Sequence, residues 1–311
     1  MTAAALVTGR LLEFAGMLVL FGSSVFYVYG FAAGELERFA RRHFWPPFVL
    51  PAAAVTGMVG VLIWVMAQTA SVSDQASDGF NPVVVWSILT EARFGRTSLL
   101  RIILLATCLL LLAAFRFSRA QWLGVAALSG ITVASLAWTG HGTKDEGMAG
   151  LAHLAGDILH LISAAVWLGA LVPLGALVIQ AVHSDESGDG RASYDALQRF
   201  SAIGIGVVAV LLASGIINSG FLVGLNFGAL LNTTYGFALS VKMALFGLML
   251  LLAAHNRYRL TPQLAQSLVE NRRGTFDALR DFRASLFLEL ALALFVLAAV
   301  AFLGTLEPPV S

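Results

Sequence analysis

Residues 151–181, LAHLAGDILHLISAAVWLGALVPLGALVIQA, form a long apolar run in which His153, Asp157 and His160 are the ionisable side chains. A bilayer-spanning helix needs about 20 predominantly apolar residues, and this run exceeds that length. Backbone N–H and C=O groups have no water to bond with inside a lipid bilayer, so a single spanning segment must be helical. The run therefore predicts a transmembrane helix with three polar side chains inside it.

Seven further runs meet the same length and hydropathy test. They are continuous apolar stretches, unlike the alternating segments of about ten residues that build an outer-membrane barrel. We therefore expect an all-α, polytopic membrane helix bundle of eight transmembrane helices. The expected spans are residues 11–34, 45–69, 98–115, 121–139, 151–181, 201–225, 235–254 and 285–304.

The composition of the 311-residue chain supports this fold class. Hydrophobic residues make up 58% and charged residues 12%, and the mean hydropathy is +0.83. Soluble domains carry roughly 25% charged residues, so this composition excludes a soluble globular enzyme and a disordered chain. The net charge of +1 gives no basic field for nucleic acid. The single cysteine, Cys108, cannot form an intrachain disulfide.

Lysine and arginine are concentrated in the connections that follow the first, third, fifth and seventh spans. These connections hold 13 of the 19 basic residues. Because basic loops remain on the cytoplasmic side, both termini are expected outside, in the periplasm of a Gram-negative cell. The first run is too long for a signal peptide and is expected to be a retained span.

The connections are short, and the chain is expected to form a single membrane domain, 1–311. In the outer connection 70–97, a turn-rich start and an amphipathic second half predict a short interfacial helix. In the inner connection 255–284, alternating charges predict a surface helix. The sequence has no phosphate-binding G-x-x-x-x-G-K-[ST] loop and no inner loop large enough for a nucleotide domain, so we expect neither nucleotide use nor an enzyme.

The polar residues of the fifth span point to metal chemistry. His153, Asp157 and His160 stand at i, i+4 and i+7, which places them on one helix face. His141 and Met148 lie just outside this span, at its outer end. Imidazole suits copper, zinc, iron and nickel, and a thioether adds a preference for Cu(I). The five residues form a graded ladder, which suits an ion that enters and leaves again.

Other interpretations of these residues stay open. A histidine inside a helix is often a hydrogen-bonded packing residue, and Asp157 could neutralise Arg101 or Lys242. Lys242 could pair with Asp157 or Glu13. Glu289, near the inner end of the last span, could be an exit gate or proton group, or could pair with inner-loop arginines. A supporting cavity is predicted from Glu13, Arg101, Asn218, Tyr235 and Lys242.

Several of these stretches resemble the bacterial copper resistance protein D family. The resemblance lies in GHG…LAHLAGDILHLISAAVWLGALVPL, in RFSAIGIGVVAVLLASGIINS and in TTYGFALSVKMALFGLMLLLAAHNRYRL. The most specific pieces are Trp-Leu-Gly at 167–169 and Tyr235-Gly236…Lys242. In the first four spans (1–140), similarity lies in the topology and in FGRTSLLRI at 94–102. The last four spans (141–311) carry most of the resemblance.

The resemblance implies a multi-pass inner-membrane protein that transports copper, Cu(I) or Cu(II), from periplasm to cytoplasm in copper homeostasis. It also implies a small periplasmic copper-binding partner of the CopC type. Two alternatives remain: a membrane redox protein that holds b-type haem between histidines such as His141 and His160, and a scaffold that delivers copper without transporting it.

Overall fold

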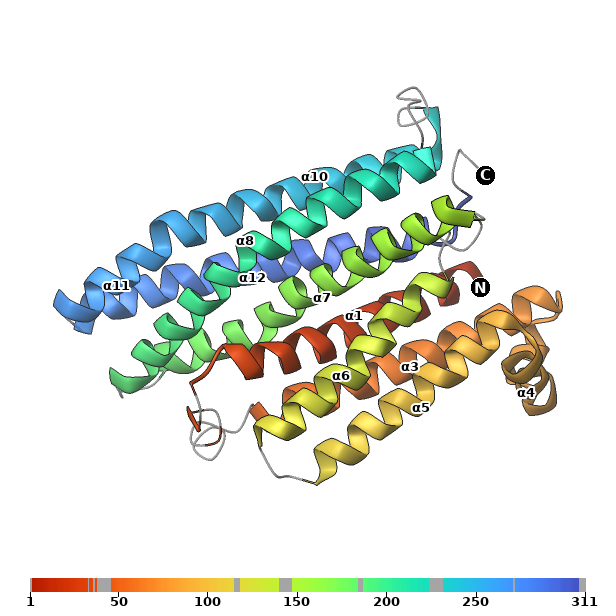
Figure 1. Ribbon diagram of the computed structural model, residues 1–311, viewed down its shortest axis with the longest axis horizontal. Coiled ribbons are helices and arrows are strands. Elements are labelled where there is room, and N and C mark those ends of the chain that lie inside the picture. Colours follow the sequence, from red (N-terminus) through yellow and green to blue (C-terminus); the bar gives the residue numbers. More distant parts are fainter. Residues whose placement is uncertain are drawn as a thin grey trace.

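The computed structural model describes residues 2–32, 34–35, 37, 46–114, 118–139, 147–183, 187–223, 232–270 and 272–307. Within these ranges every regular element is a helix. Eight of the helices are long and apolar enough to cross a membrane, which confirms the predicted number of spans. They lie side by side in one bundle (Figure 1): α1 (Thr2–Tyr29), α3 (Pro46–Val72), α5 (Arg93–Ala113), α6 (Arg119–Ser135), α7 (Gly147–His183), α8 (Ser187–Val223), α10 (Thr234–His255) and α12 (Arg272–Leu303).

Several helices begin well before the predicted spans, at both ends of the bundle. α8 begins at Ser187 and α12 at Arg272, each more than ten residues before the expected start. Hydropathy marks only the part of a helix that matches lipid, whereas backbone hydrogen bonding continues into the polar flanks. A consequence is that Glu13 and Arg101 lie well inside α1 and α5 and not at their first turns.

Two short helices lie in the long connections, as expected, and the interfacial position of the first stays a prediction. In the outer connection, a 3-10 turn (Ala76–Phe80) leads into α4 (Pro82–Glu91). Asn81 caps α4 by accepting a hydrogen bond from the backbone of Val83 at 3.1 Å, and Pro82 occupies the first turn. In the inner connection, a π-helical turn, η4 (Asn256–Leu260), joins α10 to α11 (Thr261–Glu270).

Helix α1 lies at the centre of the bundle and packs against α3, α6, α7 and α12. Glycines allow the closest of these approaches. A methyl group on Gly16 would overlap the backbone of Gly57 on α3, and one on Gly22 would overlap the backbone of Gly169 on α7. Close backbone contact through small residues is a common way to join helices in lipid. These contacts place α7, which carries the candidate ligands, directly against the central helix.

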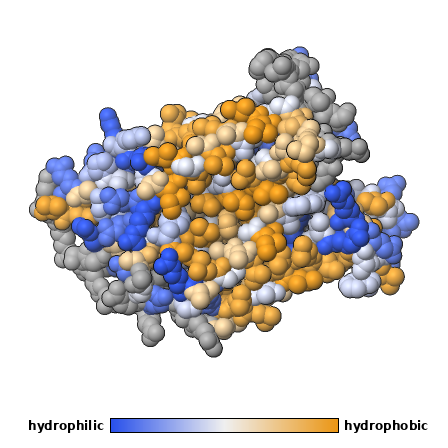
Figure 2. All heavy atoms as spheres, in the orientation of Figure 1, coloured by the Kyte–Doolittle hydropathy of each residue, from blue (hydrophilic) through white to orange (hydrophobic). Residues whose placement is uncertain are grey.

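The surface of the bundle matches a membrane environment. Figure 2 shows a broad hydrophobic belt between two more hydrophilic ends. Both termini lie at the same end, on the right of Figure 1, and α11 lies at the opposite end. This arrangement agrees with the alternation of basic connections, and the assignment of the terminal end to the periplasm stays a prediction.

Candidate functional site

The N-terminal half of α7 faces α8 through three matched pairs of side chains. The two helices are consecutive and pack together, so they run antiparallel. Because the helices are antiparallel, residue numbers that increase along α7 lie opposite residue numbers that decrease along α8. The pairs are His153 with Phe221, Asp157 with Asn218, and His160 with Ser214.

His153 is buried, with only 2% of its surface exposed. Its imidazole stacks on the Phe221 ring with the centroids 4.5 Å apart and the planes within 5°. Its Nε2 lies 4.0 Å from Oδ2 of Asp157. The stacking therefore fixes the orientation of the imidazole and keeps one ring nitrogen directed at the carboxylate.

Asp157 lies at the centre of the polar cluster. Its Oδ1 accepts a hydrogen bond from Nδ2 of Asn218 at 2.6 Å. Lys242 and Tyr235, both on α10, interact with its carboxylate electrostatically. Oδ1 of Asn218 is buried and has no hydrogen-bond partner within the described residues. The cluster therefore combines a carboxylate with an unused amide oxygen, and both are suitable donors to a cation.

His160 has a different neighbour, and that neighbour defines its tautomer. Its Nδ1 lies 3.1 Å from Oγ of Ser214. The Ser214 hydroxyl donates its proton to the carbonyl of Val210 at 2.6 Å, so its oxygen is left to accept from Nδ1–H. With the proton on Nδ1, Nε2 keeps its lone pair, as a metal-binding imidazole requires. The His160 ring also lies against Gly215 of α8.

The described residues do not form a closed metal cage. Within them, no group of three or more His, Cys, Asp or Glu side chains lies close enough to hold one ion. Met148, at the start of α7, is 81% exposed, and His141 lies outside the described residues. The structure brings His153 and Asp157 together and places His160 farther along the same helix. The predicted ladder is thus a series of separate positions along α7.

The predicted supporting residues divide into two groups. Asn218, Tyr235 and Lys242 belong to the Asp157 cluster, as described above. Glu13 and Arg101 form a separate buried ion pair, with Oε1 of Glu13 2.8 Å from Nη1 of Arg101.

The remaining guanidinium donors of Arg101 bond to the Ser135 hydroxyl and carbonyl and to the Thr139 hydroxyl, at 2.7–3.0 Å. The expectations that Arg101 neutralises Asp157 and that Lys242 pairs with Glu13 are therefore wrong, because Glu13 and Arg101 satisfy each other. Within the described residues Lys242 forms no ion pair as short as 4.0 Å, although it lies in the electrostatic range of Asp157.

Glu289 on α12 is 1% exposed and bonds to two neutral donors. Its Oε1 accepts from the Trp167 indole N–H at 3.0 Å, and its Oε2 accepts from Nδ2 of Asn256 at 3.1 Å. Among the described residues, the salt bridges do not include one between Glu289 and an arginine. The proposed pairing of Glu289 with inner arginines is therefore not what the structure shows.

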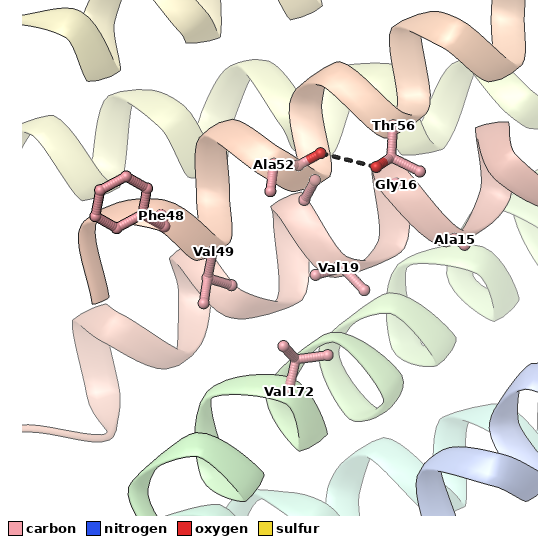
Figure 3. A pocket seen from close by; sticks show the side chains of 9 residues that line it. Ala15, Gly16, Val19, Phe48, Val49, Ala52, Thr56 and Val172 are labelled. Carbon is pink, nitrogen blue, oxygen red and sulfur yellow. Dashed lines mark hydrogen bonds between the residues drawn. The ribbon is translucent and has the colours of Figure 1, made fainter. Parts of the chain in front are cut away.

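A groove of about 490 Å³ lies between α1, α3 and α7, away from these polar residues. Figure 3 shows that Phe48, Val49, Val19 and Val172 line it with apolar side chains. The hydroxyl of Thr56, its polar lining residue, donates to Ala52 of its own helix at 2.8 Å. The groove therefore offers no ligand to a metal ion and suits an apolar chain.

The haem alternative requires two histidines at similar depth on facing helices. His153 and His160 are both on α7, so they do not face each other across a gap. His183 and His255, at the inner ends of α7 and α10, are exposed. Within the described residues this geometry does not supply a pair of axial ligands, and the haem alternative depends on His141.

Sequence reasoning missed Ser214 and Phe221. Ser214, Asn218 and Phe221 stand at i, i+4 and i+7 in the sixth span, a spacing that places two polar residues and one aromatic residue on one helix face. It mirrors the spacing of His153, Asp157 and His160. Matching spacings in consecutive spans were the available signal that α7 and α8 share this interface.

Comparisons with known proteins agree with this architecture. The family described as "Copper resistance protein D-like, N-terminal domain" matches residues 1–151, and the family "Copper resistance protein D" matches residues 194–303. Copper resistance protein D of Pseudomonas syringae pv. tomato is 33% identical over 302 residues, which cover 96% of this chain and 95% of that protein.

Two further relatives share parts of this similarity. Inner membrane protein YebZ of Escherichia coli (strain K12) is 29% identical over 96% of this chain and 97% of its own length. Copper transport protein CutJ of Bacillus subtilis (strain 168) is 36% identical over 119 residues, which cover 38% of this chain and 21% of that protein. No solved structure matches the chain significantly.

Proposed function

We propose that this chain, which belongs to the copper resistance protein D family, transports copper ions across the inner membrane from periplasm to cytoplasm. Relatives whose names refer to copper resistance, copper transport and the inner membrane support the substrate and the location. The structural observation that carries the proposal is the alignment of His153, Asp157 and His160 along one face of α7, each with a partner on the facing helix α8. Ionisable side chains inside a membrane span cost free energy, so their presence along one face favours a role in binding an ion or substrate.

Copper would enter at His141 and Met148 and pass to His153 and Asp157. The exposed thioether of Met148 can meet an ion, or a copper protein of the CopC type, at the outer surface. Thioether and imidazole ligands both accept copper, and a thioether favours Cu(I). A CopC-type partner would supply the ion directly to this entrance.

The cluster is suited to transient binding. Asp157 already has a neutral donor in Asn218 and a cationic neighbour in Lys242, so an incoming copper ion competes with both. Such competition keeps affinity moderate, and transport needs sites that release the ion as well as bind it. The membrane potential drives an inward positive charge with about 2.3 kcal/mol per 100 mV.

The proposal is tested by measuring copper uptake into proteoliposomes that contain either the unsubstituted chain or the double variant His153→Ala/His160→Ala. We expect copper to bind and accumulate with the unsubstituted chain, and both properties to fall by more than about tenfold in the double variant, because two imidazole ligands are lost. The matched control is His183→Ala/His255→Ala, which removes two exposed imidazoles and should leave uptake unchanged.

The other outcomes each contradict part of the proposal. Binding of copper without accumulation would favour a delivery scaffold. A Soret band in the purified chain would favour haem. Uptake that survives in the double variant would show that copper does not pass along α7.

A further inference from the structure

A second polar cluster lies deeper along α7 than the histidines. Trp167 is seven residues beyond His160, about 10 Å farther along the helix axis at 1.5 Å per residue. Its indole N–H donates to Glu289 of α12, and the Asn256 amide of η4 donates to the other carboxyl oxygen. The Ser285 hydroxyl in turn donates to Oδ1 of Asn256 at 2.5 Å. Four side chains from three segments thus form one chain of hydrogen bonds.

The carboxyl group of Glu289 is surrounded by neutral partners. Glu289 is 1% exposed, and its two carboxyl oxygens accept hydrogen bonds from the neutral groups of Trp167 and Asn256. An ionised carboxylate at such depth loses its hydration, and two neutral donors restore only part of that energy. The neutral acid avoids this penalty, so the site favours the binding of a proton.

Among the described residues, no salt bridge joins Glu289 to a charged side chain of a neighbouring element. On η4, Arg257 donates to the carbonyl and hydroxyl of Ser201. On α10, His255 is exposed, and on α12, Arg283 borders an apolar groove with Val172 of α7. On α1, Glu13 is paired with Arg101, and on α7 the nearest titratable side chains are His160 and His183. The other charged side chains of packed elements include Arg10 on α1, Lys242 on α10, and Asp195 and Arg199 on α8.

The Asn256 amide can serve both protonation states of Glu289. In the arrangement described above, its Nδ2 donates to the carboxylate and its Oδ1 accepts from Ser285. If the amide turns over, its oxygen accepts from a protonated Glu289 and its nitrogen donates to the Ser285 oxygen. The four side chains then stay linked by hydrogen bonds when Glu289 is protonated. A partner that bonds either form is what reversible proton binding requires.

We propose that Glu289 is a proton-binding site in the inner half of the bundle, with Trp167 and Asn256 as its positioning residues. The carboxylate oxygen that faces Asn256 takes the proton, and it returns the proton when the amide turns back. If copper moves along α7 as proposed above, this site would exchange a proton against the passing cation, because both clusters share that helix. This second step depends on the proposed function, whereas proton binding itself does not.

Infrared difference spectroscopy of the metal-free chain, recorded while the pH is changed, tests proton binding without copper. We expect a carboxyl C=O band that appears as the pH falls and is absent in Glu289→Gln. The glutamine fits the site, since its oxygen accepts from Trp167 and its amide donates to a turned Asn256. The matched control is Glu13→Gln, which alters the other deeply buried glutamate and should keep the Glu289 band.

Two results would overturn the proposal: an unchanged spectrum in Glu289→Gln, or loss of the band in Glu13→Gln instead. Trp167→Phe separates a positioning role from a packing role. It removes one donor to the carboxylate form, so the band should appear at higher pH than in the unsubstituted chain. An unchanged transition would remove Trp167 from the site.

Copper uptake at several pH values tests the coupling. We expect uptake by the unsubstituted chain to vary with pH and uptake by Glu289→Gln to lose that variation. A retained infrared band without any copper uptake would leave the proton site in place and contradict the proposed function. Uptake whose pH dependence survives in Glu289→Gln would contradict the coupling.

Discussion

Two acidic residues of the bundle, Glu13 and Asp157, meet very different surroundings. In the N-terminal half, Glu13 pairs with Arg101 at 2.8 Å, and the other donors of this arginine bond to Ser135 and Thr139. In the C-terminal half, Asp157 meets a neutral amide, an imidazole at 4.0 Å and a lysine that forms no close ion pair with it among the described residues.

The difference separates a structural site from a candidate binding site. Charge and hydrogen bonding are satisfied within the Glu13 network, so that network has nothing to offer a ligand. The Asp157 cluster keeps a buried amide oxygen, that of Asn218, without a hydrogen-bond partner among the described residues. An ion pair that is complete holds helices together, whereas a cluster that is incomplete can accept an ion.

The largest expected effect comes from breaking the Glu13 network. Arg101→Met should lower the free energy of unfolding by about 3–5 kcal/mol, because it leaves the Glu13 carboxylate buried without a cation. Thermal unfolding in detergent measures this loss. The double variant Glu13→Leu/Arg101→Met removes both charges and should recover most of the stability. A single variant as stable as the unsubstituted chain would show that the pair does not hold α1 and α5 together.

Removing the charge of Asp157 should give the opposite pattern. Asp157→Asn keeps an oxygen that accepts from Asn218, so stability should change by less than about 1 kcal/mol. Copper affinity, measured by competition with a chelator, should fall by more than about tenfold, because a direct ligand contributes more than an outer partner does. Strong destabilisation with unchanged affinity would make Asp157 a structural residue like Glu13.

The smallest effect is expected at Ser214, which would act on copper only through His160. Ser214→Ala removes the acceptor of the Nδ1 proton, and outer partners of this kind are worth about tenfold in metal affinity. Ser240→Ala is the matched control, because that hydroxyl donates to Gly236 within its own helix. Equal copper affinity in the two serine variants would mean that Ser214 does not orient a ligand.

Hydropathy alone was sufficient to predict the number of spans. The spacing of His153, Asp157 and His160 was sufficient to predict that they share one helix face. Both are local properties: one depends on the length of an apolar run, and the other on the helical repeat. For the same reason the short helices 82–91 and 261–270 could be expected from their turn residues and alternating charges. The position of the arginines also predicted which connections share one end of the bundle.

Tertiary structure alone decided which polar residues meet. From the sequence, Asp157 was suited to Arg101 or to Lys242, and Glu289 was suited to any inner arginine. The choice depended on which helices pack together and at what height, and the close contacts of Gly16 with α3 and of Gly22 with α7 are part of that packing. A charge buried in lipid must find its partner among the side chains at its own depth, and that depth is a property of the assembled bundle.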